Sequence, residues 1–551
     1  MSAATLGESV EAAGGAAAAG ESVEAVAEGD SVEVAADAAA ARVVETDPEL
    51  VETPAWYAQR KHLWVLTYSG KPVYSWHGDE SLLSSFMGML SGMIMLVLDT
   101  EDSLQFFSAG DHQFVFLVRG PIYLVMGSRT REPVWLQRAQ LNYVYAHLMF
   151  SATSRIVDIL NKRANADIRD FLEGHEPVLE RLMLSLDSQL TYMLQSYLCL
   201  PLPSKTREQV TRAVQRARPD NTLYAVMFSE NHVVTYLEKK SVPLNVDDLL
   251  LLVNWANAQL AQSTASEDGV LADLCLPNLD TRGNIHAYTG QLIPRLAVIF
   301  ISTAKDFGHV VQRRRELVTV LREEGLLEQL ERAVSLNPVL WRGSRGSAAD
   351  AAGSDGETAR PPTTAPLTGL EGADNKGVWM EPASSLFSPR AAFDFAPELW
   401  HCVFKSAAMQ QMIAPGYERF ATRADQRAVF RWYQQLYSQL LELRSSEGDS
   451  GAALGAGLGR ARRTAGMLEY FTVNAKVALL GWSTKNFELV SLHFACFAPF
   501  RAVSNCVLCR QYVMCNPLVT YERAAEIAQH IASQWLPREK EGLFLLCENG
   551  W

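Results

Sequence analysis

The stretch that decides the fold runs from residue 62 to residue 98 and reads HLWVLTYSGKPVYSWHGDESLLSSFMGMLSGMIMLVL. Its first part, residues 62–76, alternates apolar and polar side chains around Gly70 and Lys71, which predicts a β-hairpin. The second part, residues 81–98, contains no charged side chain and predicts a helix. An α/β unit is therefore expected to begin here.

The uncharged run is close to the length of a membrane span. A helix of eighteen residues rises about 27 Å, and the hydrocarbon core of a bilayer is about 30 Å thick. Serines and glycines dilute its hydropathy, acidic residues follow it, and neither flank carries an aromatic and basic anchor. We therefore expect a soluble helix that is covered on more than one face, one face by its own sheet and the other by a partner. Gly88 and Gly92 indicate close backbone approach to another element.

Length and charge limit the class of protein. At 551 residues the chain is long enough for three or four domains. Most of its net charge of −13 lies in residues 1–54, so no domain carries the basic excess of a nucleic-acid-binding protein. Eight cysteines are few for this length and predict reduced thiols. The first residues, MSAATLGESVEAAGG, lack the pattern of a signal peptide or a myristoylation site, which predicts a cytosolic protein.

The order of hairpin, helix, strands and helices recurs along the chain. A second hairpin and helix are predicted within residues 222–262, and a less regular copy follows the Gly, Ser and Pro-rich segment near 343. The predicted fold class is α/β (α+β), with three units that each contain a mainly antiparallel sheet flanked by helices. The predicted organisation is a disordered acidic tail at 1–54, units at 55–205, 218–336 and 378–551, a flexible linker at 343–377, and a loop insertion at 445–463.

Chemical motifs are sparse. The chain contains no GxxxxGK[ST], HExxH or GxSxG sequence. Cys506 and Cys509, with Cys496 and Cys515 nearby, could suggest a zinc or thiol site, but the irregular spacing favours apolar packing. We predict no catalytic residue, no metal site and no cofactor. The run Arg313, Arg314 and Arg315 is a candidate phosphoinositide contact, with a solvated helix face as the simpler interpretation.

The hairpin and helix carry a family resemblance. Gly70-Lys71-Pro72, Tyr74-Ser75 and Gly78-x-Glu80, followed by the apolar helix, resemble the first longin domain of the SAND family, the Mon-one vacuolar fusion proteins. Supporting similarity lies at Cys199-Leu-Pro, at Cys275-Leu-Pro with the following His286-Ala, around Phe404, and at EKEGLF (539–544). Residues 501–518 look inserted relative to the family pattern, and the tail shows no resemblance.

The resemblance implies a function without covalent catalysis. It implies a subunit of three longin domains that pairs with a Ccz-one-type longin subunit and catalyses guanine-nucleotide exchange on a Rab-seven-type GTPase. It also implies recruitment by a Rab-five-type GTPase and a phosphoinositide membrane surface, peripherally on endosomes and on the vacuole or lysosome. Endosome maturation, vacuolar fusion, vesicle-mediated transport and autophagy are the processes that it implies. Such a protein regulates a GTPase and is not an enzyme in the covalent sense.

Two sets of contact residues follow. We expect the face that meets the second subunit to contain Ser84, Ser85, Gly88, Met89 and Gly92. We expect the GTPase contact to lie on the hairpin and the helix start, at Lys71, Tyr74, Ser75, Gly78, Asp79 and Glu80. The alternatives are a non-catalytic longin adaptor or tether, a longin SNARE, and a zinc or thiol enzyme; the SNARE would require a heptad helix and an anchor, which LLCENGW does not supply.

Overall fold

A computed structural model describes most of the chain between Pro54 and His530. The described residues are 54–79, 81–262, 268–336, 398–406, 409–414, 420, 422–445, 459–464, 467–484, 509–515 and 517–530. The predicted tail (apart from Pro54), the predicted linker at 343–377, Glu80, Cys496 and Cys506 lie outside these residues. Among the helices described, none combines the length and the apolar character that a membrane crossing requires.

The chain divides into two compact units. The N-terminal unit comprises the described parts of Met1–Asn142 together with Ile156–Asp170, and the C-terminal unit comprises Tyr143–Arg155 and the described part of Phe171–Trp551.

The N-terminal unit contains a five-stranded antiparallel sheet in the order β2-β1-β5-β4-β3. The predicted hairpin is confirmed as β1 and β2, and the next two predicted strands are confirmed as β4 and β5. The short edge strand β3 is an addition that no pattern indicated. The strands are β1 (Lys61–Thr67), β2 (Pro72–Ser75), β3 (Phe106–Ala109), β4 (His112–Arg119) and β5 (Ile122–Ser128).

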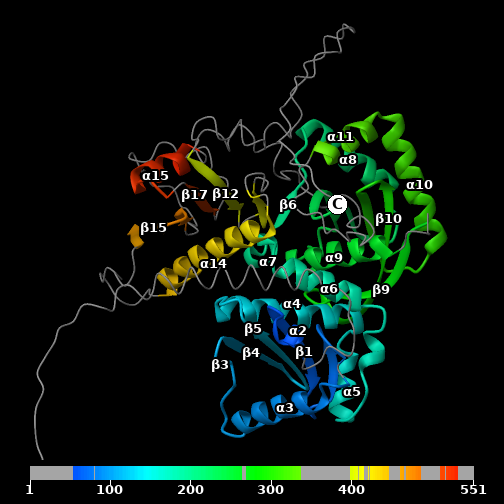
Figure 1. The fold of residues 1–551 in the computed structure, drawn as a ribbon. Helices are drawn as coiled ribbons and strands as arrows, with labels where there is room; N and C mark the ends of the chain where they lie inside the picture. The colour runs from blue at the N-terminus through cyan, green and yellow to red at the C-terminus, as the bar shows by residue number, and fades with distance from the viewer. Residues whose placement is uncertain are drawn as a thin grey trace, which may run out of the picture. The chain divides into compact units, whose positions relative to one another are not determined.

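Helices lie on both faces of this sheet. Helix α3 (Ser84–Leu98) is the predicted uncharged helix and packs on one face through a core shared with Trp64 and Phe116. The other face carries the first half of α4 (Val134–Ala152), and Figure 1 shows the strands between these two helices. The remaining helices are α2 (Pro54–Tyr57) and α5 (Arg155–Lys162).

A buried ion pair fixes the start of β1 on the α4 side. The Lys61 ammonium lies 2.5 Å from the Glu132 carboxylate, and both side chains are almost fully buried. Gln140 on α4 accepts a hydrogen bond from Lys61 at 3.3 Å. Removing one member of such a pair leaves a buried charge and costs about 3–5 kcal/mol. The pair therefore specifies how β1 meets the α4 face.

Two helices, α4 and α5, occupy the stretch that ends at Lys162, and Thr153 lies between them. Thr153 has a φ of 59°, in the left-handed region that a β-branched residue rarely adopts. An α-helix cannot continue through that backbone conformation, so α4 ends at Ala152 and α5 begins at Arg155.

The C-terminal unit contains one sheet of twelve strands, in the order β14-β15-β16-β17-β12-β13-β6-β8-β7-β11-β10-β9. The second predicted hairpin is confirmed as β7 and β8, with its turn at Glu230 and Asn231. The strands are β6 (Tyr197–Cys199), β7 (Thr222–Ser229), β8 (His232–Glu238), β9 (Val270–Leu276), β10 (Asp280–Ile293), β11 (Leu296–Ser302), β12 (Leu399–Ser406), β13 (Gln411–Ile413), β14 (Gly459–Thr464), β15 (Met467–Val473), β16 (Ala478–Thr484) and β17 (Cys509–Cys515).

Helices cover this sheet in both halves. α8 and α10 share a core with β7, β8 and β11, whereas α15 shares a core with β12, β16 and β17. The described helices of this unit, after the 3-10 turn Arg169–Phe171 between the units, are α6 (Glu176–Leu186), α7 (Leu190–Leu194), α8 (Ser204–Ala217), α9 (Val246–Gln262), α10 (Phe307–Glu323), α11 (Leu326–Leu336), α14 (Arg423–Ser445) and α15 (Tyr521–His530).

The three-residue strand β6 joins the two halves of the twelve-stranded sheet. It pairs in parallel with β8 on one side and with β13 on the other. Gln411 donates a hydrogen bond of 2.8 Å to the Tyr197 hydroxyl and accepts one of 3.3 Å from the Cys199 thiol. Because all three side chains are buried, these bonds satisfy polar groups that would otherwise destabilise the joint.

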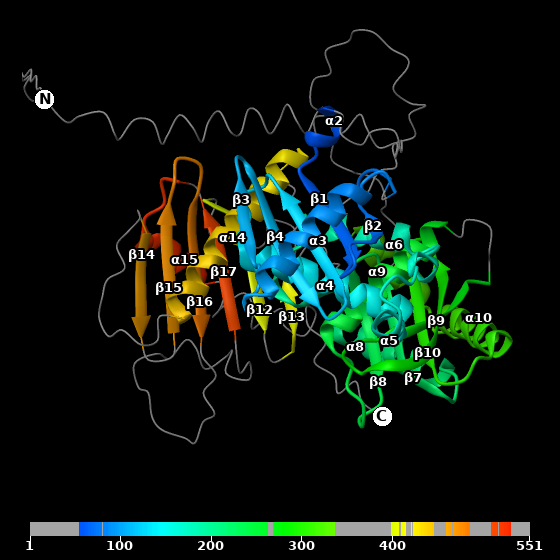
Figure 2. The same cartoon turned by 90° about the horizontal axis from the view of Figure 1, so that it is seen from below.

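Two segments expected outside the regular fold are strands. β17 comes from the segment expected to be an insertion at 501–518, yet it lies between β16 and β12 in the interior of the sheet, as Figure 2 shows. Its alternating Val513 and Cys515 side chains enter the core beneath α15, which explains its central place. β14 comes from the loop expected at 445–463 and forms the edge next to β15. Gly and Arg in that strand concealed its pairing, because neither is typical of a strand.

Of the four cysteines considered as a zinc or thiol site, Cys509 and Cys515 lie within the described residues. Cys509 begins β17, and Cys515 is a buried free thiol whose pKa is raised to about 12 by burial. Within the described ranges no group of three or more His, Cys, Asp or Glu side chains could hold a metal ion. A thiol with a raised pKa is a poor nucleophile, so Cys515 acts as a core residue.

Candidate functional site: a helix face and a hairpin turn

Helix α3 has two different faces. The inner face buries Met87, Leu90, Ser91 and Ile94 against the sheet. The outer face is exposed and includes every residue predicted to meet a second subunit, namely Ser84, Ser85, Gly88, Met89 and Gly92. Large apolar side chains share that exposure: Leu82 is 61% exposed, Met89 54%, Met95 45% and Leu96 71%. We call these eight residues the α3 outer face.

The glycines of the α3 outer face leave open space. A Cβ atom built on Gly88 or Gly92 would meet no heavy atom within 4 Å. The helix therefore does not need glycine at these positions to pack within the N-terminal unit. Their effect is to keep the outer face flat, so that another backbone can approach closely.

The β1–β2 turn approaches α3 closely beside Gly88, and the glycine that permits this approach is Gly70 in the turn. Gly70 has a φ of 79°, and a Cβ on it would lie 3.2 Å from the Gly88 Cα. The Ser91 hydroxyl donates a hydrogen bond of 3.0 Å to the Tyr68 carbonyl in the same turn. The turn is thus seated on α3 by a backbone contact and a hydrogen bond.

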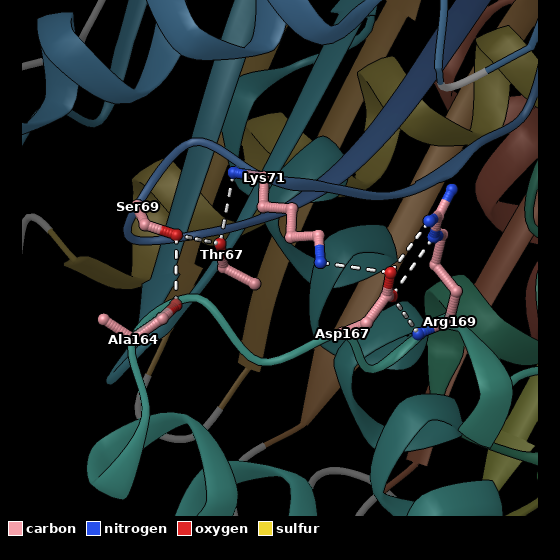
Figure 3. Close-up of polar contacts among 6 residues, drawn as sticks. All are labelled: Thr67, Ser69, Lys71, Ala164, Asp167 and Arg169. Atoms are coloured by element: carbon pink, nitrogen blue, oxygen red, sulfur yellow. Dashed lines mark hydrogen bonds and ion pairs between the residues drawn. The ribbon is translucent and has the colours of Figure 1, made fainter.

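A second segment holds the other side of this turn, as Figure 3 shows. The Ser69 hydroxyl donates to the Ala164 carbonyl at 3.1 Å, and the Lys71 ammonium lies 3.1 Å from the Asp167 carboxylate. Within the turn, the Lys71 amide donates to the Thr67 hydroxyl at 3.2 Å. The β1–β2 turn is therefore fixed from two directions.

Asp167 is itself tightly held. Arg169 donates to it through Nε at 3.1 Å, through a terminal nitrogen at 2.8 Å and through its backbone amide at 3.1 Å. These hydrogen bonds from Arg169, followed by the contact from Lys71, lower the pKa of Asp167 far below its usual range. The carboxylate is therefore charged at neutral pH and keeps Lys71 in place.

The other predicted GTPase contacts differ in accessibility. Tyr74 and Gly78 are half-buried, and Gly78 has a φ of 89°. Ser75 is buried, and its hydroxyl donates to the His77 carbonyl at 2.9 Å, so it supports the end of β2. Asp79 accepts a hydrogen bond of 2.7 Å from the Ser81 amide before α3. Lys71 is the residue of this predicted set that carries a positive charge.

The predicted phosphoinositide contacts lie on α10 of the C-terminal unit and point to different partners. Arg313 pairs with Glu316 at 2.9 Å, and Arg315 pairs with Asp268 at 2.6 Å. Arg314 donates to the Gln291 carbonyl at 2.6 Å. Because each guanidinium has a contact within the unit, lipid binding here would have to compete with these contacts.

Sequence reasoning did not find Ser69, Ala164, Asp167 or Arg169. Ser69 and Ala164 are 95 residues apart in the sequence, and four strands and the helices α3, α4 and α5 lie between them. The only local signal was the alternation of cations and carboxylates at 162–170, which is equally typical of a solvated loop. The described site thus combines an exposed apolar face with a cation that is held in place.

Comparison with known proteins confirms three longin domains. Residues 61–182 match the first longin domain of FUZ, MON1 and HPS1, residues 220–319 match the second, and residues 398–540 match the third. The three matches together cover more than half of the chain. The N-terminal unit thus contains most of the first domain, and the twelve-stranded sheet contains the strands described for the second and third.

Curated relatives carry one recurring name. The Vacuolar fusion protein MON1 homolog of Arabidopsis thaliana is 29% identical over 388 residues, which are 70% of this chain and 60% of that protein. The Oryza sativa homolog is 24% identical over 90% of this chain and 76% of its own length. The human homolog A is 29% identical over 50% of this chain and 42% of its own length. The chain thus spans less than two thirds of the Arabidopsis and human relatives that it matches.

Proposed function

This chain belongs to the MON1 (SAND) family of proteins with three longin domains, and we propose that it acts in membrane trafficking as one subunit of a guanine-nucleotide exchange factor. The proposed second subunit is a Ccz-one-type longin protein, and the proposed substrate is a Rab-seven-type GTPase. The printed names of the relatives, vacuolar fusion proteins, support a role in vacuolar fusion. The α3 outer face is the observation that carries the two-subunit arrangement.

The size of the α3 outer face supports an interface that extends beyond it. Burying one large apolar side chain completely stabilises a complex by about 1.5–3 kcal/mol. The four exposed ones, Leu82, Met89, Met95 and Leu96, therefore contribute at most about 6–12 kcal/mol. Association itself costs about 4–15 kcal/mol, so these side chains alone roughly offset that cost. Neighbouring elements of the first domain must contribute the remaining affinity.

Exchange of this kind requires binding surfaces rather than a nucleophile or a metal. A factor that binds the nucleotide-free GTPase more tightly than the loaded form stabilises the state in which nucleotide has left. The fixed turn beside α3 is suited to this task, because it presents Lys71 near the end of a face that a second subunit would cover. The GTPase contact that we propose begins at this turn and continues through Tyr74, Gly78, Asp79 and Glu80.

The same proposal includes recruitment of the protein to a membrane. We assign it to a Rab-five-type GTPase and a phosphoinositide surface, with the protein peripherally on endosomes and on the vacuole or lysosome. The roles implied are endosome maturation, vacuolar fusion and autophagy. Arg313, Arg314 and Arg315 are the proposed lipid contacts, on condition that their partners Glu316 and Asp268 release them.

The test is a nucleotide-release assay. The chain is co-expressed with its Ccz-one-type subunit, purified, and added to a Rab-seven-type GTPase loaded with a fluorescent guanine nucleotide. We expect release to accelerate about tenfold or more, which corresponds to lowering the barrier by about 1.4 kcal/mol. A Rab-five-type GTPase loaded in the same way serves as the control and keeps its intrinsic rate.

The alternative is a longin adaptor or tether that holds its partners without changing nucleotide release. An unchanged rate, in a complex that still binds the GTPase, would favour this alternative. No acceleration and no GTPase binding would remove the substrate assignment altogether.

A further inference from the structure

We propose that Asp167 and Arg169 are positioning residues that hold the Lys71 ammonium ready for an acidic side chain of the GTPase. This inference rests on the function proposed above and adds two residues from a segment that no sequence motif marked. Lys71 is the residue that would contact the GTPase. Asp167 holds Lys71 in position, and Arg169 holds Asp167 in position.

The three charged groups lie in a row, with Arg169 in contact with Asp167 and Asp167 in contact with Lys71. Asp167 accepts three hydrogen bonds from Arg169, so its carboxylate has a defined position. Lys71 meets that carboxylate at 3.1 Å, and its side chain is still 34% exposed. An ammonium has three N–H donors. Lys71 can therefore donate one hydrogen bond to Asp167 and another to an acceptor on an incoming partner.

The main physical effect is preorganisation. A lysine side chain is long and flexible, and ordering one in an interface costs about 0.5–1.5 kcal/mol. The Asp167 carboxylate orders Lys71 before the partner arrives, and Arg169 prevents the carboxylate from rotating away. An exposed ion pair contributes little to folding, so the arrangement is better explained by its effect on binding.

The local charge indicates an acidic partner. Lys71 and the segment 162–170 contain four cations, Lys71, Lys162, Arg163 and Arg169, against two carboxylates, Asp167 and Asp170. Lys162 and Arg163 are exposed and directly precede Ala164, which accepts the Ser69 hydrogen bond. A positive surface of this kind accelerates association with a negative one and fixes its orientation.

A protein carboxylate fits this site better than a membrane. Anionic membranes attract basic residues by about 1 kcal/mol each, mainly through their number, and require no fixed geometry. Lys71 and Arg169 are only partly exposed and are held by directed hydrogen bonds. Fixed donors suit an acceptor with a defined position.

The experiment measures exchange kinetics on the two-subunit complex with Lys71→Ala, Asp167→Asn and the double variant. We expect Lys71→Ala to raise KM about tenfold with kcat unchanged, because the contact forms when the GTPase docks. Asp167→Asn should raise KM about threefold in the wild-type background. It should have no further effect in the Lys71→Ala background, because Asp167 acts only through Lys71. Lys71→Arg, which keeps the charge, should recover part of the loss.

A matched control comes from the second domain. Lys305 forms a similar exposed pair with Asp273, at 2.9 Å, and has no place in the proposed site. Lys305→Ala should leave KM and kcat unchanged. Thermal unfolding and co-purification with the second subunit check that each variant folds and pairs.

Several results would overturn the inference. An unchanged KM in Lys71→Ala would remove the contact, and equal losses from Asp167→Asn in both backgrounds would assign Asp167 a structural role only. Weaker binding of Lys71→Ala to phosphatidylcholine vesicles containing phosphoinositide, with KM unchanged, would point to a lipid surface instead. If the wild-type complex does not accelerate release, the proposed exchange function fails. The same variants are then compared for binding of nucleotide-free GTPase, where unchanged affinity in Lys71→Ala contradicts the inference independently.

Discussion

Helices α3 and α9 occupy equivalent places in the first two longin domains, but their outer faces differ. Each follows the first hairpin of its domain, and each donates a side-chain hydrogen bond to a carbonyl of that hairpin turn. In the first domain Ser91 donates to Tyr68 at 3.0 Å, and in the second Asn257 donates to Glu230 at 2.8 Å. α9 is buried without interruption from Leu249 to Ala256, whereas α3 buries one stripe of four residues.

The difference arises from what covers each helix. α6 packs on α9, and Asn254 of α9 donates a hydrogen bond of 3.0 Å to the Val178 carbonyl of α6. Among the residues that the structure describes, no element covers the α3 outer face in this way. Because α3 has the uncharged composition of a covered helix, the second subunit proposed above would supply the missing cover. Four predictions test this contrast.

The largest expected effect is the loss of Trp255 from α9. This side chain is fully buried, so Trp255→Ala should lower the free energy of unfolding of the C-terminal unit by about 3–5 kcal/mol. Met89→Ala on the α3 outer face should change the stability of the unpaired chain by no more than about 0.5 kcal/mol. Urea unfolding followed by circular dichroism measures both. Equal destabilisation by the two changes would show that the α3 outer face is as buried in the unpaired chain as α9 is.

The second prediction concerns pairing. Gly88→Leu should weaken association with the Ccz-one-type subunit about a hundredfold, or about 2.7 kcal/mol, because a bulky side chain would stand on the flat outer face. The fold should be retained, since a Cβ at this position has open space and glycine is a poor helix former. Co-purification and calorimetry measure the loss. Gly308→Leu is the control, at an exposed helix position where a Cβ would meet only the Asp306 carboxylate oxygen, at 3.9 Å. Normal pairing by Gly88→Leu would refute the interface.

The third prediction is acid sensitivity of the first domain. The pKa of His62 is lowered to about 3, mainly by burial and then by nearby His77, so folding favours the neutral ring. Its contribution is complete above about pH 6.5, the pKa of an unfolded histidine, and declines as the pH falls towards 3. Between pH 7 and pH 5 the loss from His62 amounts to about 2 kcal/mol.

His62→Phe tests that prediction because phenylalanine keeps the ring beside Trp64 and cannot be protonated. The variant loses the hydrogen bond from His62 Nε2 to the Trp56 carbonyl, so it should be less stable at pH 7 but less sensitive to acid. Hydrogen exchange of peptides from β1, corrected for the intrinsic rate, reports this locally, with α9 peptides as the internal reference. The same acid sensitivity in the variant would assign the effect to other groups.

The smallest expected effect compares the two turn anchors. Ser91→Ala and Asn257→Ala each remove a side-chain donor to a turn carbonyl, and each should cost about 1 kcal/mol. Thermal unfolding of each variant measures this cost. A negligible cost for Ser91→Ala would show that the Gly70 contact alone seats the first turn on α3.

Sequence patterns predicted the elements that depend on local periodicity. The hairpin at β1 and β2 has a period-two signal, α3 is an uncharged run and α9 has an amphipathic pattern. The three-domain organisation followed from the recurrence of this order. β3 and β6 are too short for such a signal, and the arginines of β14 resemble those of a loop. β17 was taken for an insertion because it departs from the family pattern, although its buried residues place it in the core.

The candidate site likewise contains residues that sequence patterns could predict and residues that they could not. Five residues of the α3 outer face, Ser84, Ser85, Gly88, Met89 and Gly92, could be predicted to share one exposed surface, because they are neighbours on one helix. The ion pair between Lys71 and Asp167 could not be predicted. Asp167 comes from a segment beyond α5 that reaches the β1–β2 turn only in the folded domain. Long-range pairs of exposed charges leave no periodic trace in a single sequence.

Strand β6 has a consequence for synthesis of the chain on the ribosome. The hydrogen bond between Cys199 and Gln411 joins residues 212 positions apart, so β6 is made long before its partner strand β13. At about 5–20 residues per second, the interval is about 10–40 s. During that time the half of the sheet that includes β8 ends in an unpaired edge at β6, the kind of edge to which foreign strands add. Translation that stalls between β11 and β12 would prolong this exposure, so the nascent chain is most in need of a chaperone there.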